Sequence, residues 1–401
     1  MRRPLILNTV LSLLFSAALA APVAAQEIVG DQSVSEEAHK PNAIYGVDLS
    51  PNGKSYAILR DYDGQTVVAI YDADDAQKPP AAVGLGDLPA GPFAWGGEDH
   101  VLVRIMADQP GVRTVEGLKT VRMSRWMVVD KKSGKMETLF GNEFGDQLYY
   151  FIGAAGDLIS TLPQKPGYAL FARAEVEVRA TQARRLETGE DDVVYSLQEA
   201  NLDKARTRRV EAGKEKTIDW VVGQNGEPLA RIDEAASGAI EVFAKLAGKS
   251  SFSKAGEIDY DKSPYSDVKF YGAAGENELQ ALVTEDTGAQ KLVAYNLVSG
   301  AVGDAIFTPA SGTVDSVIYD YRRGAATAVV ADGSIHHLTA GDAETAASLE
   351  KAVPDSKVLI LSKSVSGERM IVQAWKADGK TEYYFYDAPG RRLELIASDA
   401  E

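Results

Sequence analysis

The chain has 401 residues, a formal net charge of −16 and no cysteine. Its length suits either about two or three average domains or one large repeat architecture. The lack of cysteine excludes disulfides, thiolate metal sites, iron–sulfur clusters and a cysteine nucleophile. The acidic balance argues against nucleic acid and anionic membrane surfaces as partners, because both favour clustered positive charge.

The first 25 residues have the layout of a secretory signal peptide. A short basic start at Arg2-Arg3 precedes an apolar run from Leu5 to Ala20, and small residues lead to a cut before Gln26. The apolar run is about 16 residues long, shorter than the roughly 20 that span a bilayer, and an uncleaved anchor is the alternative. We therefore predict a periplasmic or secreted protein, with residues 1–25 removed and no membrane span left.

Residues 26–43 form a polar leader, and after them one repeating unit fills the chain up to residue 396, before a short tail at 397–401. The unit opens with an apolar strand, a turn rich in Gly, Asn or Asp, and a second apolar strand. Opening halves begin at Tyr45, Pro92, Phe151, Asp219, Lys269, Val317 and Leu359. Closing halves begin at Arg125, Leu292 and Tyr383, with a degenerate copy at Val193.

Seven such units of roughly 50 residues predict an all-β fold, a seven-bladed β-propeller with four-stranded antiparallel blades. Packing the blades around an axis covers both faces of every sheet. Two β-sandwich domains are the competing interpretation, although they do not require the same two half-units seven times. The Gly and Asn in the turns are explained by the positive φ that tight hairpins need.

Two segments interrupt the repeat. Tyr168–Asp192 is charged and rich in alanine, and we interpret it as an inserted helix or an extended hairpin. Residues 342–353 predict a short helix, with Asp342 as its N-cap and Pro354 just beyond its end.

The order of the half-units, the segments FAWGGEDHVLV from Phe93 and YYFYDAPGRRLELIA from Tyr383, and the short helix before LILSKSVSGERMIVQAW together resemble one known domain. It is the N-terminal propeller of secreted bacterial serine peptidases of the prolyl oligopeptidase family, on the acylaminoacyl-peptidase and dipeptidyl-peptidase side. The resemblance implies a domain that restricts access to an active site and helps to seat peptide substrates.

The catalytic α/β-hydrolase domain of that family is not expected in this chain. The sequence has no G-x-S-x-G nucleophile motif; the nearest segments, around Ser55 and Ser250, lack the second glycine. No catalytic residue is therefore carried over, and catalysis would need a hydrolase domain from another chain. The alternative function is a stand-alone periplasmic interaction propeller of the TolB-like kind, with a peptide or protein as its ligand.

We predict no cofactor and no metal site. His39, His100, His336 and His337 do not have zinc-ligand spacing, and adjacent histidines on a strand point to opposite faces. The acidic segments at Asp61–Gly64 and Glu257–Asp261 are interpreted as solvated hairpin turns, because the glycine is misplaced for a calcium loop.

Other motifs are attributed to chance or to packing. Three S-x-x-K matches, starting at Ser251, Ser266 and Ser348, lack the accompanying S-D-N, and Lys132-Ser133-Gly134 is equally isolated. Gly84-Leu85-Gly86 lacks the third glycine of a dinucleotide loop. We expect the four tryptophans to anchor the packing of the blades: Trp95, Trp126, Trp220 and Trp375.

Overall fold

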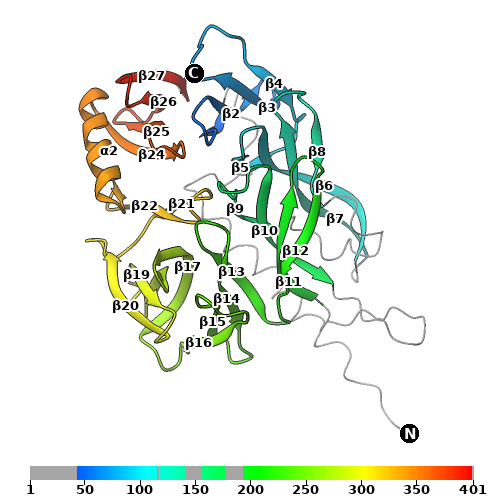
Figure 1. Ribbon diagram of the computed structural model, residues 1–401, viewed down its shortest axis with the longest axis vertical. Coiled ribbons are helices and arrows are strands. Elements are labelled where there is room, and N and C mark those ends of the chain that lie inside the picture. Colours follow the sequence, from blue (N-terminus) through cyan, green and yellow to red (C-terminus); the bar gives the residue numbers. More distant parts are fainter. Residues whose placement is uncertain (1–42, 115–116, 141–155, 177–192, 400–401) are drawn as a thin grey trace.

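The computed structural model describes residues 43–114, 117–140, 156–176 and 193–399 (Figure 1). The predicted signal peptide and nearly all of the predicted leader therefore lie outside the described residues, as does His39. In the described part, no helix is both long and apolar enough to cross a bilayer.

Five antiparallel sheets each contain four strands that are paired in chain order. Their strands are β1 (Ile44–Leu49), β2 (Ser55–Tyr62), β3 (Gln65–Asp72) and β4 (Ala81–Gly84); β5 (Ala90–Gly96), β6 (His100–Thr114), β7 (Gly117–Asp130) and β8 (Met136–Thr138); β9 (Asp157–Ser160), β10 (Tyr168–Val176), β11 (Val193–Asn201) and β12 (Arg206–Glu211); β13 (Thr217–Val222), β14 (Pro228–Glu234), β15 (Ile240–Ala244) and β16 (Ser253–Ile258); and β24 (Ser356–Lys363), β25 (Arg369–Lys376), β26 (Thr381–Asp387) and β27 (Arg392–Ser398).

The remaining strands form one longer path. They are β17 (Tyr265–Gly275), β18 (Glu278–Glu285), β19 (Gln290–Asn296), β20 (Ala301–Phe307), β21 (Ser316–Asp320), β22 (Ala325–Ala331) and β23 (Ser334–His337). A single residue pair, Gly272 with Ala325, joins β17 to β22. The part of this path formed by β21–β23 has three strands among the described residues, whereas the other sheets have the predicted four. The count of seven blades stays a prediction, because it depends on treating β17–β20 and β21–β23 as separate blades.

The sheets are arranged as a ring (Figure 1), as expected for a β-propeller. Separate buried clusters fill each junction between successive sheets, and one joins the last sheet to the first. Neighbouring sheets therefore cover most of the apolar faces, which is the reason that a blade is stable in a ring and not alone. The first strands of several sheets lie next to one another: β1 contacts β5 and β24, and β13 contacts β9 and β17.

The predicted turn chemistry is present at the hairpins. Asp63-Gly64 joins β2 to β3 and Asp332-Gly333 joins β22 to β23, and all four residues have positive φ. Two consecutive residues with positive φ form the two-residue turn whose twist matches that of the paired strands. These positions favour Asp and Gly for a local reason, so the sequence alone could locate them.

The short helix is present as α2 (Ala340–Ala352), but its predicted N-cap is wrong. Thr339 is the cap: it has extended backbone, and its side chain accepts a hydrogen bond from the backbone N–H of Asp342 at 3.2 Å. The helix buries Ala346 and Leu349 against β24–β27, so it covers one face of the last sheet.

The predicted insertion at Tyr168–Asp192 begins as a strand. Tyr168–Val176 pairs along its full length with β11, which agrees with the extended-hairpin alternative for this part. Residues 177–192 lie outside the described residues.

The ring closes by packing between separate sheets, because β1–β4 and β24–β27 share no strand. The ring of Tyr56 stacks on Phe385 with centroids 6.2 Å apart. Arg369 forms an ion pair with Asp74 at 2.6 Å and donates to the carbonyl of Gly53 at 3.1 Å. Apolar contact and a charged clamp therefore hold the two ends of the ring together.

We predict that Phe385→Ala lowers the free energy of unfolding by about 3–5 kcal/mol, because it opens a cavity at this closing junction. Phe385 is 1% exposed. Urea denaturation measures the change. Leu395→Ala in β27, where the side chain is 53% exposed, should change it by less than about 0.5 kcal/mol. Equal effects of the two variants would contradict closure through Phe385.

Candidate functional site

Four aspartates project from the innermost strands around the axis. They are Asp48 in β1, Asp157 in β9, Asp219 in β13 and Asp320 in β21. No motif in the sequence marks them, although each falls inside an opening half of the repeat. Their recurrence in the first strand of four of the units is the signal that could have found them.

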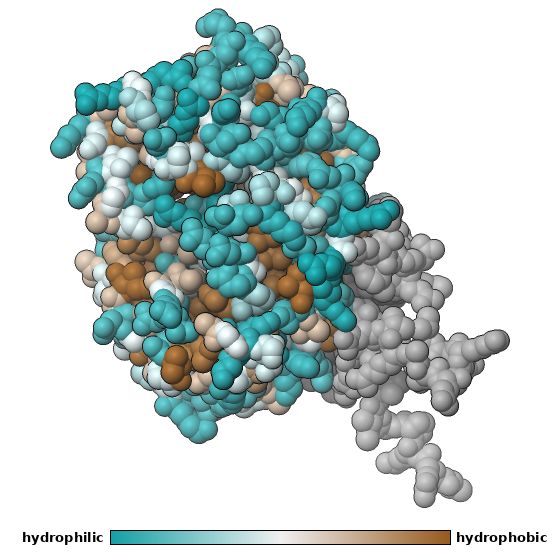
Figure 2. All heavy atoms as spheres, in the orientation of Figure 1, coloured by the Kyte–Doolittle hydropathy of each residue, from teal (hydrophilic) through white to brown (hydrophobic). Residues whose placement is uncertain are grey.

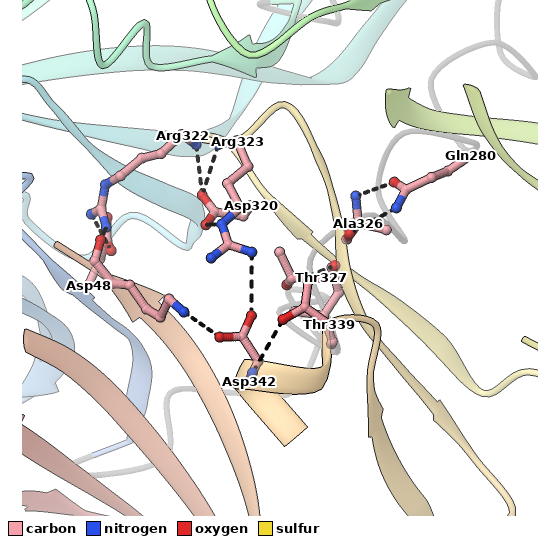
Figure 3. A network of polar contacts seen from close by, with 11 residues as sticks. Asp48, Gln280, Asp320, Arg322, Arg323, Ala326, Thr327, Thr339 and Asp342 are labelled. Carbon is pink, nitrogen blue, oxygen red and sulfur yellow. Dashed lines mark hydrogen bonds and ion pairs between the residues drawn. The ribbon is translucent and has the colours of Figure 1, made fainter. Parts of the chain in front are cut away.

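Asp48 connects three parts of the ring. Its Oδ1 accepts the backbone N–H of Leu49 at 2.8 Å, and its Oδ2 accepts the backbone N–H of Trp95 at 2.9 Å. Arg322 Nη2 lies 2.7 Å from Oδ1 in a salt bridge that Figure 3 shows. The carboxylate is therefore held by the second sheet and by the turn that follows β21.

Arg322 is almost fully buried and uses its guanidinium to join distant strands. Besides Asp48, it donates to the backbone carbonyl of Leu49 and, at 2.8 Å, to that of Lys363 in β24. One side chain therefore links β21–β23 to both the first and the last sheet. A buried arginine with several acceptors is stable only while these partners are in place.

Beside it, Arg323 bridges two carboxylates (Figure 3). Its guanidinium lies 3.8 Å from Asp320 and 3.4 Å from Asp342, which also pairs with Lys363. Burial alone would raise the pKa of Asp342, but the bonds and charges of Lys363 and Arg323 lower it below its ordinary value. Asp342 is therefore an ion-pair residue at the first turn of α2.

Asp157 is compensated by one residue of the neighbouring sheet and one of its own sheet. Arg104 of β6 lies 3.3 Å from its Oδ1, and the hydroxyl of Tyr195 in β11 donates to its Oδ2 at 2.7 Å. Burial, followed by the charges of Asp157 and Asp219, raises the pKa of Tyr195 well above its ordinary value, so this hydroxyl stays protonated and remains a donor.

The end of β21 and the turn after it cross the axis. The hydroxyl of Tyr319 donates to the carbonyl of Ile159 at 3.0 Å, and the backbone N–H of Thr161 donates to the carbonyl of Tyr321 at 3.0 Å. Ile159 and Thr161 belong to the β9–β12 sheet, which β13–β16 and β17–β20 separate from β21–β23 around the ring. These hydrogen bonds therefore span the centre of the propeller.

Asp219 differs from the other three aspartates. Its Oδ1 accepts the backbone N–H of Trp220 at 2.7 Å, and no cation lies within ion-pair distance in the described part of the chain. Burial raises the pKa of Asp219 from 3.8 to about 7; the charge of Asp157 also raises it, while the Trp220 N–H and Lys269 lower it. Asp219 is therefore a carboxyl group that titrates near neutral pH.

The histidines that the sequence singled out lie away from this cluster. The ring of His336 contacts that of Phe307 in a tilted arrangement with centroids 4.6 Å apart, and His337 Nε2 lies 3.2 Å from the carbonyl of Val358. The two rings therefore face different neighbouring sheets, as predicted for adjacent residues of a strand. His100 is buried, with Nε2 3.3 Å from Asp203, at a hollow that β7, β8 and the turn after β11 also line.

The other motifs occupy ordinary structural positions. Ser133 Oγ donates to Asp130 at 2.6 Å, and Ser251 is exposed. Asp61 corrects the prediction of a solvated turn: it is fully buried at the end of β2, and only the residues after it are exposed. Within the described ranges, no group of three or more histidine, aspartate or glutamate side chains is arranged to hold a metal ion.

The tryptophans lie where sheets meet. Trp95 and Trp126 are fully buried in the first two junctions, and Trp220 is buried between β9–β12 and β13–β16. Trp375 packs at the junction of β21–β23 with the last sheet. These positions fit the predicted role as packing anchors.

No protein-family model and no curated protein matches the sequence of this chain. Among solved structures, it is similar to prolyl endopeptidases, at 11% identity and a TM-score of 0.40, over 89% of this chain and 41% of that one. It is also similar to TolB from Acinetobacter baumannii, at 12% identity and a TM-score of 0.35, over 87% and 65% of the two chains. Puromycin hydrolase is similar at 12% identity and a TM-score of 0.43, over 92% and 55%.

The chain thus spans less than two thirds of each of these three proteins. Both peptidases and TolB occur among the similar structures, so the comparisons do not separate the two predicted functions. The propeller architecture itself rests on the sheet order and the packing described above.

We predict that Arg322→Met lowers the free energy of unfolding by about 3–5 kcal/mol, because it leaves the carboxylate of Asp48 without its counter-charge. Adding Asp48→Asn should recover part of the loss. Arg323→Met, at a side chain that is 34% exposed, should cost about 1 kcal/mol or less. Urea denaturation of the four proteins measures these differences, and a double variant no more stable than Arg322→Met would contradict the explanation.

We predict that Asp219→Asn removes a pH dependence of stability. A carboxyl group whose pKa is raised by folding stabilises the native state while protonated in it. That contribution is complete below pH 3.8, the pKa of the aspartate in the unfolded chain, and is lost as the pH rises to about 7. The unfolding free energy of Asp219→Asn relative to the natural protein should therefore rise between these pH values and stay level above them. A difference that does not vary with pH would contradict the assignment.

Proposed function

We propose that this chain is a binding propeller that recognises a peptide or protein partner and carries no catalytic chemistry of its own. The proposal corresponds to the stand-alone interaction module that the sequence suggested. The predicted signal peptide supports a place for it in the periplasm or outside the cell.

The crossing of the axis is the observation that carries this proposal. A gating propeller controls passage to an active site, whereas here Tyr319 and Tyr321 bond to the opposite side of the ring. Bonds that span the centre leave the axis better suited to holding a ligand at its mouth than to passing one through. The view in Figure 2 supports a contact role, since apolar side chains emerge among hydrophilic ones over the half of the face where β13–β20 lie.

The substrate-gating role of prolyl oligopeptidase-type peptidases is the second candidate. The segments from Phe93 and from Tyr383 support it through their resemblance to that family. In this reading the chain would act with a separate hydrolase chain, and peptide hydrolysis would require both.

Selection from a random-peptide phage-display library tests the binding proposal. Synthetic copies of enriched peptides should bind the purified chain, and Asp157→Asn or Tyr319→Phe at the axis should weaken binding at least about tenfold. Asp304→Asn, at an exposed position of β20, is the matched control and should leave binding unchanged. A library without enriched peptides, or equal loss in all three variants, would overturn the proposal.

The same preparation should not hydrolyse aminoacyl or peptidyl chromogenic substrates. Turnover that a serine-directed inhibitor abolishes would contradict the non-catalytic role. Turnover that appears only after a hydrolase chain is added would favour the gating role.

A further inference from the structure

The four axial aspartates provide an internal comparison. Three of them have an arginine partner in the described residues: Asp48 with Arg322 at 2.7 Å, Asp157 with Arg104 at 3.3 Å, and Asp320 with Arg323 at 3.8 Å. Asp219 occupies an equivalent inner strand and has none. Because a carboxylate removed from water requires compensation, the exception marks a position where a positive charge would be stabilised.

The oxygens of Asp219 are not equivalent. Oδ1 accepts the backbone N–H of Trp220, whereas Oδ2 has no hydrogen-bond donor among the residues that the structure describes. The residue as a whole is half-buried. A peptide N–H alone does not neutralise a carboxylate.

The groups around Asp219 do not supply the missing charge. Tyr195 and Tyr319 face it, but their hydroxyls already donate to Asp157 and to the carbonyl of Ile159. Asp157 adds negative charge. Of the groups that shift the pKa of Asp219, Lys269 has the smallest effect. The chain as a whole carries a net charge of −16, which draws cations toward it.

We propose that Asp219 binds the cationic side chain of a peptide ligand, the ammonium of a lysine or the guanidinium of an arginine. The ligand would supply at Asp219 the counter-charge that Arg322, Arg104 and Arg323 supply at the other three aspartates. This inference rests on the proposed binding role, and it names the chemistry that the axis recognises.

The test uses the full chain labelled with ¹⁵N-tryptophan, because the backbone N–H of Trp220 reports directly on Asp219. The probes are n-butylammonium chloride and methylguanidinium chloride, with n-butanol as the uncharged match and potassium chloride as the salt control. The Trp220 amide signal should move with both cationic probes and stay in place with both controls. Signals of Trp95, Trp126 and Trp375 are the internal reference.

Asp219→Asn should weaken the binding of both cationic probes at least about tenfold. Asp304→Asn, at an exposed position of β20 away from the axis, should leave the binding of both probes unchanged. Movement of the Trp220 signal in Asp219→Asn, or movement caused equally by n-butanol, would overturn the proposal. The same movement with calcium chloride at lower concentration would also overturn it, in favour of an inorganic cation.

The natural protein provides a second measurement that needs no variant. Since the pKa of Asp219 is about 7, binding of n-butylammonium should be at least about tenfold weaker at pH 5 than at pH 8. The charged and titratable groups that face the same carboxyl are Asp157, Lys269, Tyr195 and Tyr319, and the effect should disappear in Asp219→Asn. Binding that is independent of pH would overturn the proposal.

Failure of the two proposals can be told apart. Enriched peptides that bind equally well with their lysine and arginine residues replaced by glutamine would leave the binding function in place and remove the role of Asp219. A Trp220 response to cationic probes without any enriched peptide would keep the cation site and remove the peptide-binding function.

Discussion

The buried contact of Arg322 with Asp48 is the constraint on which the arrangement of this ring depends. Packing between sheets is mostly local, because the buried residues of each apolar junction come from two neighbouring sheets. Arg322 instead joins the turn after β21 to β1 and to β24 at once. A guanidinium has enough donors for three acceptors in fixed directions, so its position specifies how three sheets meet at the axis. Apolar packing stabilises the ring, and this ion pair fixes the relative positions of the three sheets at the axis.

The crossing of the axis follows from the same turn. With Arg322 anchored on the first and last sheets, the preceding residues extend across the centre, where Tyr319 and Tyr321 bond to the β9–β12 sheet. Polar groups at a centre that water reaches poorly must find partners in the protein. Consequently the axis contains paired charges and tyrosine hydroxyls, and the functional groups of this propeller are concentrated in the place where its sheets converge.

The features that the sequence predicted are the ones with local causes. Strand alternation and turns such as Asp332-Gly333 depend on neighbouring residues, so the propeller and most of its hairpins could be inferred. The ion pair of Asp48 with Arg322 joins residues 274 positions apart, so no local sequence pattern predicts it. The N-cap was misplaced for a related reason: Asp342 is a good capping residue by type, but Lys363 and Arg323 engage its carboxylate while Thr339 caps the helix. Tertiary charge pairing overrode local preference at both places.

That division also explains why Asp219 could not be distinguished from its counterparts by inspection of the repeat. All four axial aspartates sit in opening strands, and three of them meet arginines that come from other units or from a following turn. What sets Asp219 apart is the absence of such a partner among the described residues, which is a property of the assembled ring and not of its unit. An uncompensated carboxyl group at the axis costs stability when it ionises. The other three axial aspartates each have an arginine partner, and a similar partner would also have neutralised Asp219. Binding of a cationic ligand accounts for an ionisable carboxyl group being kept there without one.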